Sequence, residues 1–254
     1  MSRPVEILTL PSKGLLYDGR VPDGLVEYHP MTAKEEKYLA GGFKDGNAII
    51  DAIIRSCVPS LTVPVDDLLI GDKFFMMLVI RASSYGSSYG MEIKCPNCDK
   101  KFRHEIDLGF SEGSDEDAAF SIKVLDDGAK EPFEVTLPKC KDTVQFRLLR
   151  GSDEKSIAKQ IDREMQHRNK KEGNPAYIYR LARHIVSVNG EELDPKQARE
   201  YIEELIGLDS AVLRQEIDNV DVGVDTTFST DCLYCNEEFE GVLAMGPEFF
   251  RPKY

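Results

Sequence analysis

With 254 residues the chain is long enough to bury a core without disulfides, and two small units are the more common arrangement at this length. Its 32 basic and 45 acidic residues give a formal net charge of −13, so the surface as a whole repels nucleic-acid backbones and anionic membranes. No apolar run approaches the roughly 20 residues that span a bilayer, and Pro4, Glu6 and Pro11 interrupt the amino terminus where a signal peptide would be apolar. We therefore expect a protein that stays in the cytoplasm where it is made and has no membrane partner.

The amino-terminal segment is predicted to form a small β element followed by a helix. The stretches VEILTL and LVEYHP have the composition of short strands and are separated by Asp-Gly and Lys-Gly turns. Thr32 and Glu35 form a capping-box pattern, in which the hydroxyl accepts from an amide of the first turn and the glutamate reaches back to the cap. This pattern predicts a helix over residues 33–40.

Two more helices are predicted before the first pair of cysteines. Asn47 precedes AIIDAIIRSCV, whose apolar residues recur at helical spacing, and we expect it to cap a helix that stops at Pro59. Asp72 is expected to cap the strongly apolar helix KFFMMLVIRASSYG, with Gly86 as its end.

The residues after this helix alternate as two strands around a Cys-x-x-Cys turn. SSYGMEIK leads into Cys95 and Cys98, and FRHEIDL follows them. The next segment, SEGSDEDA, is acidic and small, as in a solvated linker. We therefore predict a first half over residues 1–110, an acidic linker over 111–130 and a second half over 131–254.

The second half resembles the first in the order of its elements. Leu137-Pro138 repeats an earlier Leu-Pro pair and is followed by a strand, TVQFRLL, and by a polar helix that starts at Ser152 and ends near residue 168. An apolar helix, YIYRLARHIVSV, comes next. An inserted turn, NGEEL, and Pro195 then lead into the helix KQAREYIEELI.

Past this insertion the two halves align at a constant offset of 137 residues. The identical pairs are Asp72 and Asp209, Ile80 and Ile217, Gly86 and Gly223, Cys95 and Cys232, Cys98 and Cys235, and Phe102 and Phe239. Most of these positions have structural roles as a helix cap, a helix end or part of a metal-type turn. The pattern predicts an α+β protein built by internal duplication, each half carrying helices and a β-hairpin with a zinc knuckle. Convergence of two unrelated segments is the alternative.

Four of the six cysteines form two Cys-x-x-Cys pairs, which in a reducing compartment are more easily explained as metal ligands than as disulfides. A tetrahedral zinc ion needs two such turns, with bonds of about 2.3 Å. We predict that Cys95, Cys98, Cys232 and Cys235 share one structural Zn²⁺ that joins the two halves and leaves no position for water. The flanking charges are expected to attract one another, since Lys94, Lys100, Lys101 and Arg103 surround the first turn and Asp231, Glu237 and Glu238 the second.

Three other interpretations of these cysteines remain open. The first is a redox centre, although such a motif usually opens a helix and Cys98 leads into a predicted strand. The second is two pairs of reduced thiols without metal. The third is one zinc ion per half with help from His104, although the second half has no histidine at the equivalent place. Cys57 and Cys140 are expected to be buried small hydrophobic residues.

The sequence contains no recognisable catalytic arrangement. Residues 86–90, GSSYG, match the G-x-S-x-G motif of hydrolases, but the predicted order is helix then strand, the reverse of what that motif requires. The four histidines, His29, His104, His167 and His184, lie in no metal-binding or acid–base motif, and there is no Walker or dinucleotide-binding loop. We therefore predict that the protein is not an enzyme.

Five stretches, taken in their order and spacing, resemble one known family. LPSKGLLYDG, HPMTAKEEKYLA, IIDAIIRSCV, DLLIGDKFFMMLVIRASSYGSSY and CPNC together are similar to the T4-type phage baseplate proteins. The resemblance covers about residues 7–110, and it extends to the second half only through the repeated pattern and CLYC. These proteins take part in building the central hub of the baseplate of contractile-tailed phages. The resemblance implies a non-enzymatic hub component or assembly factor, and it carries over only a cysteine pair, onto Cys95 and Cys98.

The sequence thus predicts a structural or chaperone-like protein of the baseplate hub that binds other tail proteins. We expect it in the host cytoplasm during assembly and in the baseplate of the virion tail. The binding surface is predicted on the FFMMLVI face at 74–80 or on GPEFFRPKY at 246–254. One alternative is a zinc-ribbon nucleic-acid or transcription accessory module, which the charge of −13 disfavours. Another is a thiol oxidoreductase.

Overall fold

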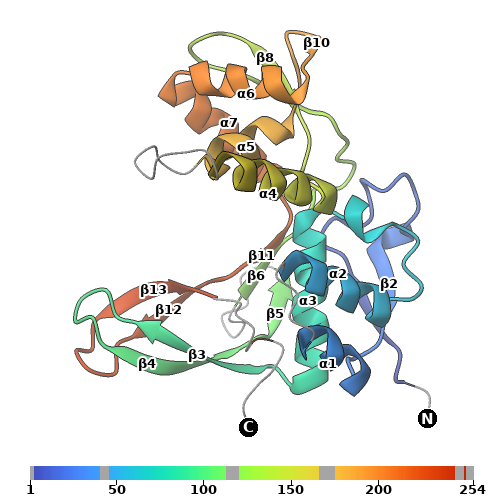
Figure 1. Ribbon diagram of the computed structural model, residues 1–254, viewed down its shortest axis with the longest axis vertical. Coiled ribbons are helices and arrows are strands. Elements are labelled where there is room, and N and C mark those ends of the chain that lie inside the picture. Colours follow the sequence, from blue (N-terminus) through green and yellow to red (C-terminus); the bar gives the residue numbers. More distant parts are fainter. Residues whose placement is uncertain (1–2, 41–45, 113–119, 166–174, 244–248, 250–254) are drawn as a thin grey trace.

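The computed structural model describes residues 3–40, 46–112, 120–165, 175–243 and 249. Within these residues the protein is a mixed α/β structure with two lobes and a projecting arm (Figure 1). The α-helices are α1 (Ala33–Ala40), α2 (Gly46–Cys57), α3 (Ile70–Tyr85), α4 (Gly151–Met165), α5 (Ala176–His184), α6 (Pro195–Glu204) and α7 (Gly207–Val220). Two single 3-10 turns are η1 (Pro22–Gly24) and η2 (Val65–Asp67).

The strands form several small sheets. In the first lobe, β1 (Glu6–Thr9) pairs with β2 (Leu25–Tyr28), and β11 (Gly223–Asp225), β6 (Phe120–Lys123) and β5 (Phe110–Glu112) form a second sheet in that order. The second lobe holds β10 (Glu191–Glu192), β9 (Ile185–Val188), β8 (Thr143–Phe146) and β7 (Phe133–Thr136). The arm consists of two antiparallel hairpins, made by β3 (Ser88–Lys94) with β4 (Lys101–Asp107) and by β12 (Thr227–Asp231) with β13 (Glu238–Val242).

The predicted starts of the first three helices are partly confirmed. Helix α1 spans the predicted residues, and the Glu35 carboxylate accepts from the Thr32 backbone N–H at 2.8 Å, as a capping box requires. Helix α2 begins at Gly46, so Asn47 lies in its first turn and is not the cap. Asp72 likewise lies in the first turn of α3 and does not cap it, because its carboxylate is bonded to a distant turn.

The predicted helix over YIYRLARHIVSV is wrong in its last third. Helix α5 ends at His184, and Ile185–Val188 form strand β9, which pairs with β8 and β10. Three of these four residues are Ile or Val, which favour strands when a neighbouring strand is available. The polar helix predicted to end near residue 168 is confirmed as α4 up to Met165, and the remainder of the prediction falls outside the described residues.

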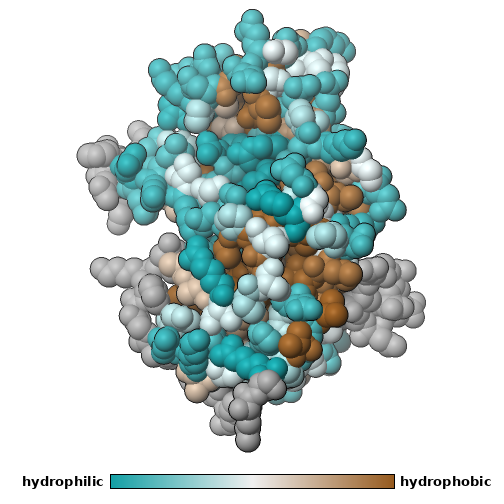
Figure 2. Space-filling view, turned by 90° about the vertical axis from the view of Figure 1, so that its right-hand side faces the viewer, coloured by the Kyte–Doolittle hydropathy of each residue, from teal (hydrophilic) through white to brown (hydrophobic). Residues whose placement is uncertain are grey.

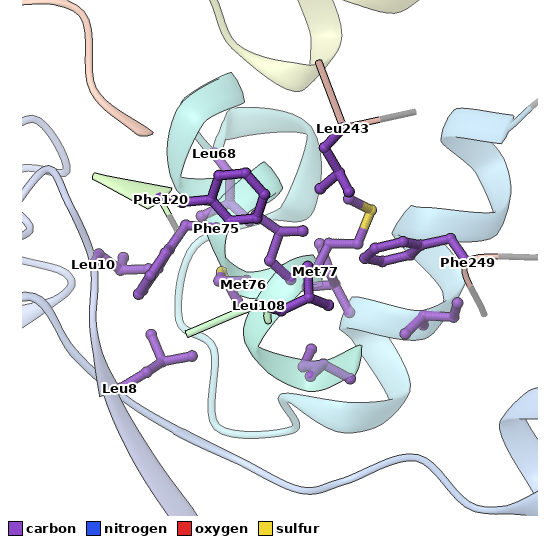
Figure 3. Close-up of a cluster of buried hydrophobic side chains, with 14 of the residues drawn as sticks. Leu8, Leu10, Leu68, Phe75, Met76, Met77, Leu108, Phe120, Leu243 and Phe249 are labelled. Atoms are coloured by element: carbon purple, nitrogen blue, oxygen red, sulfur yellow. The ribbon is translucent and has the colours of Figure 1, made fainter. Parts of the chain in front are cut away.

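The first hydrophobic core surrounds α3. Figure 3 shows Phe75, Met76 and Met77 of this helix together with residues from both ends of the chain, from Leu8 and Leu10 to Leu243 and Phe249. The core therefore brings the carboxy-terminal segment against the amino-terminal elements. Leu108 and Phe120, which flank the acidic segment, also belong to it.

A second, smaller core lies between α5, α6, α7 and the strands of the second lobe. It contains Phe146, Leu181, Ile202 and Leu213, among others. Part of the predicted linker forms strand β6, which pairs with β5 and β11, while residues 113–119 fall outside the described residues. The division at 111–130 stays a prediction.

Of the two surfaces predicted to bind partners, the first is buried and the second is described at one residue only. The side chains of residues 75–78 and Ile80 are buried in the first core, so the FFMMLVI face packs inside the protein. In GPEFFRPKY, Phe249 is 0% exposed and lies edge-on to Tyr89 with a 5.1 Å centroid distance. The other residues of that stretch fall outside the described part of the chain. Apolar composition could not distinguish a core helix from a docking face here.

In the described part of the chain, no helix has the length and apolar character needed to cross a membrane.

Candidate metal centre

The first Cys-x-x-Cys motif forms the tight turn of the β3–β4 hairpin. The strands pair over seven residues, from Ser88 opposite Asp107 to Lys94 opposite Lys101. Beyond them, the Cys95 N–H donates to the Lys100 carbonyl at 3.0 Å, and the Asp99 N–H donates to the Cys95 carbonyl at 3.1 Å. Asp99 adopts a left-handed conformation, with φ of 59°, which Asp and Asn tolerate better than most residues. The turn therefore points two thiols toward one side.

The second motif forms the same turn in the β12–β13 hairpin. The Cys232 N–H donates to the Glu237 carbonyl at 2.9 Å, and the Asn236 N–H donates to the Cys232 carbonyl at 2.9 Å. Asn236 takes the left-handed conformation here, with φ of 55°. Each of these residues lies 137 positions after its counterpart in the first turn, so the sequence offset corresponds to a shared local geometry.

The four predicted ligands come together at the end of the arm that is farthest from the helices (Figure 1). Their Sγ atoms all lie within 4.8 Å of one another, although Cys98 and Cys232 are 134 residues apart. The Cys95–Cys235 separation is 3.7 Å and the Cys98–Cys232 separation is 3.6 Å. Four sulfurs at 2.3 Å from a tetrahedral ion are about 3.8 Å apart. The arrangement thus has the dimensions of a tetrathiolate metal site.

The local structure around the cysteines bears on the redox interpretation. All four cysteines are free, and the residues after Cys98 enter strand β4 and not a helix. This local structure differs from the helix opening of a typical Cys-x-x-Cys redox centre.

Backbone amides favour thiolates in this cluster. The Cys98 N–H approaches the Cys95 Sγ at 3.5 Å, and the Tyr234 N–H approaches the Cys232 Sγ at 3.4 Å. Burial raises the pKa of Cys232, but the N–H groups of Tyr234 and Cys235 and the neighbouring thiols outweigh it and lower the pKa to about 7. At Cys98 the Lys100 N–H lowers the pKa, but burial and hydrogen bonds with the other three cysteines raise it to about 11. Without a cation, repulsion between neighbouring thiolates makes it unfavourable for all four cysteines to be deprotonated.

Aromatic side chains hold the two hairpins side by side. Phe102 of β4 meets Tyr234 and Phe239 edge-on, with centroid distances of 6.4 and 6.3 Å. His104 stacks on Phe228 at 5.3 Å. Such contacts each contribute about 0.5–1.5 kcal/mol beyond their buried area. The sequence comparison had singled out Phe102 and Phe239 only as equivalent positions, whereas the structure shows that they touch.

His104 takes no part in the cysteine cluster. Its Nδ1 lies 3.3 Å from the Thr230 hydroxyl, and its ring packs against Phe228. Among the side chains that the structure describes, the group able to hold a metal ion consists of the four cysteines alone. One metal site per half, with His104 as a ligand, is therefore not the arrangement observed.

The expected attraction between the flanking charges is wrong. Lys94 pairs with Asp99 at 2.5 Å and Lys101 with Glu92 at 2.7 Å, so both lysines are neutralised within the first hairpin. Lys100 does cross to the second hairpin, where its ammonium lies 4.7 Å from the centre of the Tyr234 ring. No ion pair between the two hairpins occurs among the residues for which the structure gives positions. A cation–π contact and aromatic packing take the place of the expected charge pairing.

The remaining predicted site residues behave differently from one another. Cys57 is 0% exposed, as expected for a small hydrophobic residue. Cys140 is exposed, contrary to the prediction, because it lies in a turn whose backbone N–H is bonded to Asp209 at 3.0 Å. The GSSYG stretch connects helix α3 to strand β3, which confirms that it lacks the strand-then-helix context of a hydrolase nucleophile.

Comparison of the sequence with known proteins identifies a family. The family described as "T4 bacteriophage base plate protein" matches residues 15–251, nearly the whole chain and both hairpins. The chain belongs to the T4 bacteriophage base plate protein family. No curated protein and no solved structure gave a match. In this base plate protein, the match extends the resemblance seen in the first half to the second Cys-x-x-Cys motif.

Proposed function

We propose that the protein is a non-enzymatic structural or assembly protein of the baseplate hub of a contractile phage tail, where it binds other tail proteins. The match of residues 15–251 to a base plate family carries this proposal. The chemistry of the chain agrees with it, because the group able to hold a metal ion in the described residues is a closed set of four thiols. A chaperone-like role during assembly, in the host cytoplasm, and retention in the finished tail are both compatible with such a protein.

We further propose that Cys95, Cys98, Cys232 and Cys235 bind one Zn²⁺. The donor set supports this choice, since tetrahedral sites with four sulfur ligands are typical of structural zinc. With all four positions filled by the protein, the ion would have no open site for substrate or water. Its contribution would be to hold the ends of two hairpins together, in the way that structural zinc supplies folding free energy to small domains.

An internal duplication is the origin that we propose for the two hairpins. Three features support it besides the equivalent turns. In each half an aspartate at the third position of a helix accepts an N–H from the turn after a Leu-Pro pair, at 2.9 Å for Asp72 and 2.7 Å for Asp209. The residues before these helices, Leu69 and Ile206, have nearly equal backbone angles. The close sulfur pairs, Cys95–Cys235 and Cys98–Cys232, are equivalent to each other, because the 137-residue offset relates Cys95 to Cys232 and Cys98 to Cys235.

The nucleic-acid alternative has little support. Two of the four basic residues on which it depends, Lys94 and Lys101, are paired with carboxylates, and Lys100 lies over an aromatic ring. A binding face for phosphates would need these charges to be free.

One purification tests the function and the metal together. The protein carries an affinity tag in infected cells and is isolated with its partners, which mass spectrometry identifies, while elemental analysis measures zinc. We expect baseplate proteins of the same phage and one zinc ion per chain. A protein that elutes alone as a monomer throughout infection would contradict the proposed function, and a metal-free protein with all thiols reduced would contradict the proposed zinc site.

A further inference from the structure

Within the described residues, strand β1 has an open edge. It pairs with β2, and the Leu10 N–H donates to the Gly24 carbonyl at 2.8 Å in the same register. Residues of an antiparallel pair alternate between facing the partner strand and facing away from it. Leu8 and Leu10 therefore direct their backbone groups to β2, and Ile7 and Thr9 direct theirs to the opposite side. None of the hydrogen bonds of the described residues reaches the Ile7 or Thr9 backbone from that side.

The other edge of this small sheet is already occupied. On β2, the Glu27 carbonyl accepts from the Ser60 hydroxyl at 3.2 Å, and just after the strand the His29 N–H donates to the Cys57 carbonyl at 2.8 Å. Exposed strand edges are a hazard that folded proteins usually cover. The contrast between the two edges makes β1 the one that is left available.

A groove runs along the open edge. Its volume is about 670 Å³, and residues 7–11 form one wall while Ile122 and Val124 form part of the other. Phe75 of the first core also lines it. At one end the Leu125 N–H donates to the Pro11 carbonyl at 2.9 Å, on the side to which Ile7 and Thr9 also point. The chain after β6 thus contacts the residue two positions after β1, and the groove between the two segments has room for another extended segment.

The rim of the groove is apolar and exposed. Of the residues that line it, Ile7 is 66% exposed, Val124 41% and Leu15 40%. Figure 2, which shows the side of the molecule on which β2 lies in Figure 1, has a broad hydrophobic area over the first lobe. Single exposed apolar residues are common on any protein, but contiguous apolar patches beside a groove are typical of binding sites.

We propose that the open edge of β1 binds an extended segment of another tail protein, which adds a strand to the β1–β2 sheet. This inference rests on the proposed function. The backbone groups of Ile7 and Thr9 require an extended partner, since main-chain hydrogen bonds supply affinity in strand addition and alternate side chains enter pockets. In the lining, Lys13 is paired with Asp127 at 2.7 Å, which leaves the Asp23 carboxylate to attract a cation. The segment should therefore carry a Lys or Arg beside its apolar residues. The charge of −13 disfavours a second copy of the chain as the occupant.

The test uses the full-length protein and synthetic peptides of 12 residues that tile the baseplate and tail proteins encoded by the same phage. Fluorescence anisotropy measures binding of each peptide. We expect at least one peptide with alternating apolar residues to bind, and the same peptide with N-methyl groups on alternate amides to bind at least about tenfold more weakly, because it cannot pair with a strand edge.

Two variants and a control locate the site. Ile7→Lys and Thr9→Pro should each weaken binding of that peptide at least about tenfold, the first through the apolar rim and the second by removing an edge N–H. Ile206→Lys is the matched control, since Ile206 is 58% exposed on the second lobe. Thermal melting followed by circular dichroism checks that each variant is folded. If Thr9→Pro does not fold, Ile7→Lys alone tests the site.

Three outcomes of the experiments on the purified protein would overturn the inference. The first is that no peptide binds. The second is that the peptide binds equally well after N-methylation, or binds Ile7→Lys as well as the wild type. The third is that the wild-type protein is a dimer and Ile7→Lys is a monomer. The proposed function is judged separately. If Ile7→Lys is purified from infected cells with the same baseplate proteins as the wild type, the function stands and the edge is not the contact.

Discussion

Glu35 is a buried carboxylate whose partners come from three segments of the first lobe. It accepts from Arg3 at 2.8 Å, from the Ser56 hydroxyl at 2.6 Å and from the Thr32 N–H at 2.8 Å. Burial alone raises its pKa, but Ser56, Arg3 and Thr32 together lower the pKa to about 2. The side chain is 0% exposed, so these bonds are not exchanged with water. A residue that the sequence marked only as part of a capping box therefore ties the amino terminus to α1 and α2.

Glu35→Gln tests this role through the pH dependence of stability. Because the folded pKa is depressed, the carboxylate contributes stability above its unfolded pKa of about 4.5, and this contribution is lost as the pH falls toward 2. At pH 7 we expect the variant to be less stable by about 1.5–3 kcal/mol in urea unfolding.

The difference between wild type and variant should shrink steadily between pH 5 and about 2. Comparing the two proteins at each pH cancels acid effects on the cysteine cluster, which both contain. A difference that stays constant over this range would show that the ionised carboxylate is not what stabilises the contact.

Asp72 and Asp209 show how a buried acid can be missed at the sequence level. Asp72 binds the Ser12 N–H and hydroxyl and the Tyr17 hydroxyl, at 2.9, 2.5 and 2.6 Å. An aspartate near a helix start is usually a cap, so the pattern predicted a local partner. The true partner lies 60 residues away, in the turn after Leu10-Pro11. The Asp72–Asp209 equivalence was detectable in the sequence, but its role was not.

At the scale of elements, the two hairpins depend on one another. Neither is a stable unit alone, because an isolated two-stranded hairpin is marginal in water. Each contributes one face to the row of contacts between Phe102, His104, Phe228 and Phe239, and each contributes two thiols to the cluster at the end. We therefore expect metal binding and hairpin packing to be coupled.

Cys95→Ser and Cys232→Ser test this coupling, with Cys140→Ser as the matched control because Cys140 is a free cysteine outside the cluster. Elemental analysis of the purified proteins should find one zinc ion per chain in wild type and control, and less than half of that in each cluster variant. The cluster variants should also unfold at lower temperature, since structural zinc supplies folding free energy.

Exchange of amide hydrogens should localise the loss to β3, β4, β12 and β13. A full zinc equivalent in either cluster variant would show that the four cysteines do not act as one site. Unchanged stability after metal removal from the wild type would show that the ion is not structural.

The elements that the sequence located well are those with strong local signals. Helix α3 and the two turns were recognisable because an apolar helix, a glycine end and a Cys-x-x-Cys spacing each leave a pattern within a few residues. Strand β9 was missed because a run of four residues with three apolar ones, directly after a helical pattern, is interpreted as more helix until β8 is known to lie beside it. The exposure of Cys140 and the free edge of β1 depend on contacts between distant segments, which no local pattern reports.

At the scale of the whole molecule, a buried ionic cluster links the two lobes. Asp51 of α2, only 2% exposed, pairs with Lys73 of α3 and with Lys155 of α4, each at 2.5 Å. Lys155 also pairs with Asp66 in η2. Burial raises the pKa of Asp51, but the two lysines lower it below its usual value. Lys155 is thus one contact between α4 of the second lobe and the first lobe, beside the backbone hydrogen bonds from Ile70 to Leu149 and from Gly151 to Leu68.

Lys155→Met should weaken the junction of the lobes. It removes one of the two cations beside a buried carboxylate, and we expect a loss of about 1–3 kcal/mol, moderated because Lys73 remains. Lys159→Met is the control, since Lys159 lies one turn further along the same helix and is exposed.

Thermal unfolding of the Lys155 variant should separate into two transitions, or broaden, as the lobes uncouple. A single transition at the wild-type temperature would mean that the ionic cluster does not hold the lobes together.

The distance along the chain between the two halves of the cysteine site has a consequence for synthesis. Cys98 and Cys232 are 134 residues apart, so the site closes a loop of more than half the chain. Such long-range closure is slow compared with local folding, and amino-terminal segments fold first as the chain emerges from the ribosome. Until the last hairpin has been made, Cys95 and Cys98 have no opposing ligands. Loading of the proposed metal ion would therefore report that the second hairpin has been made, and a copy terminated before Cys232 would lack two of the four thiols.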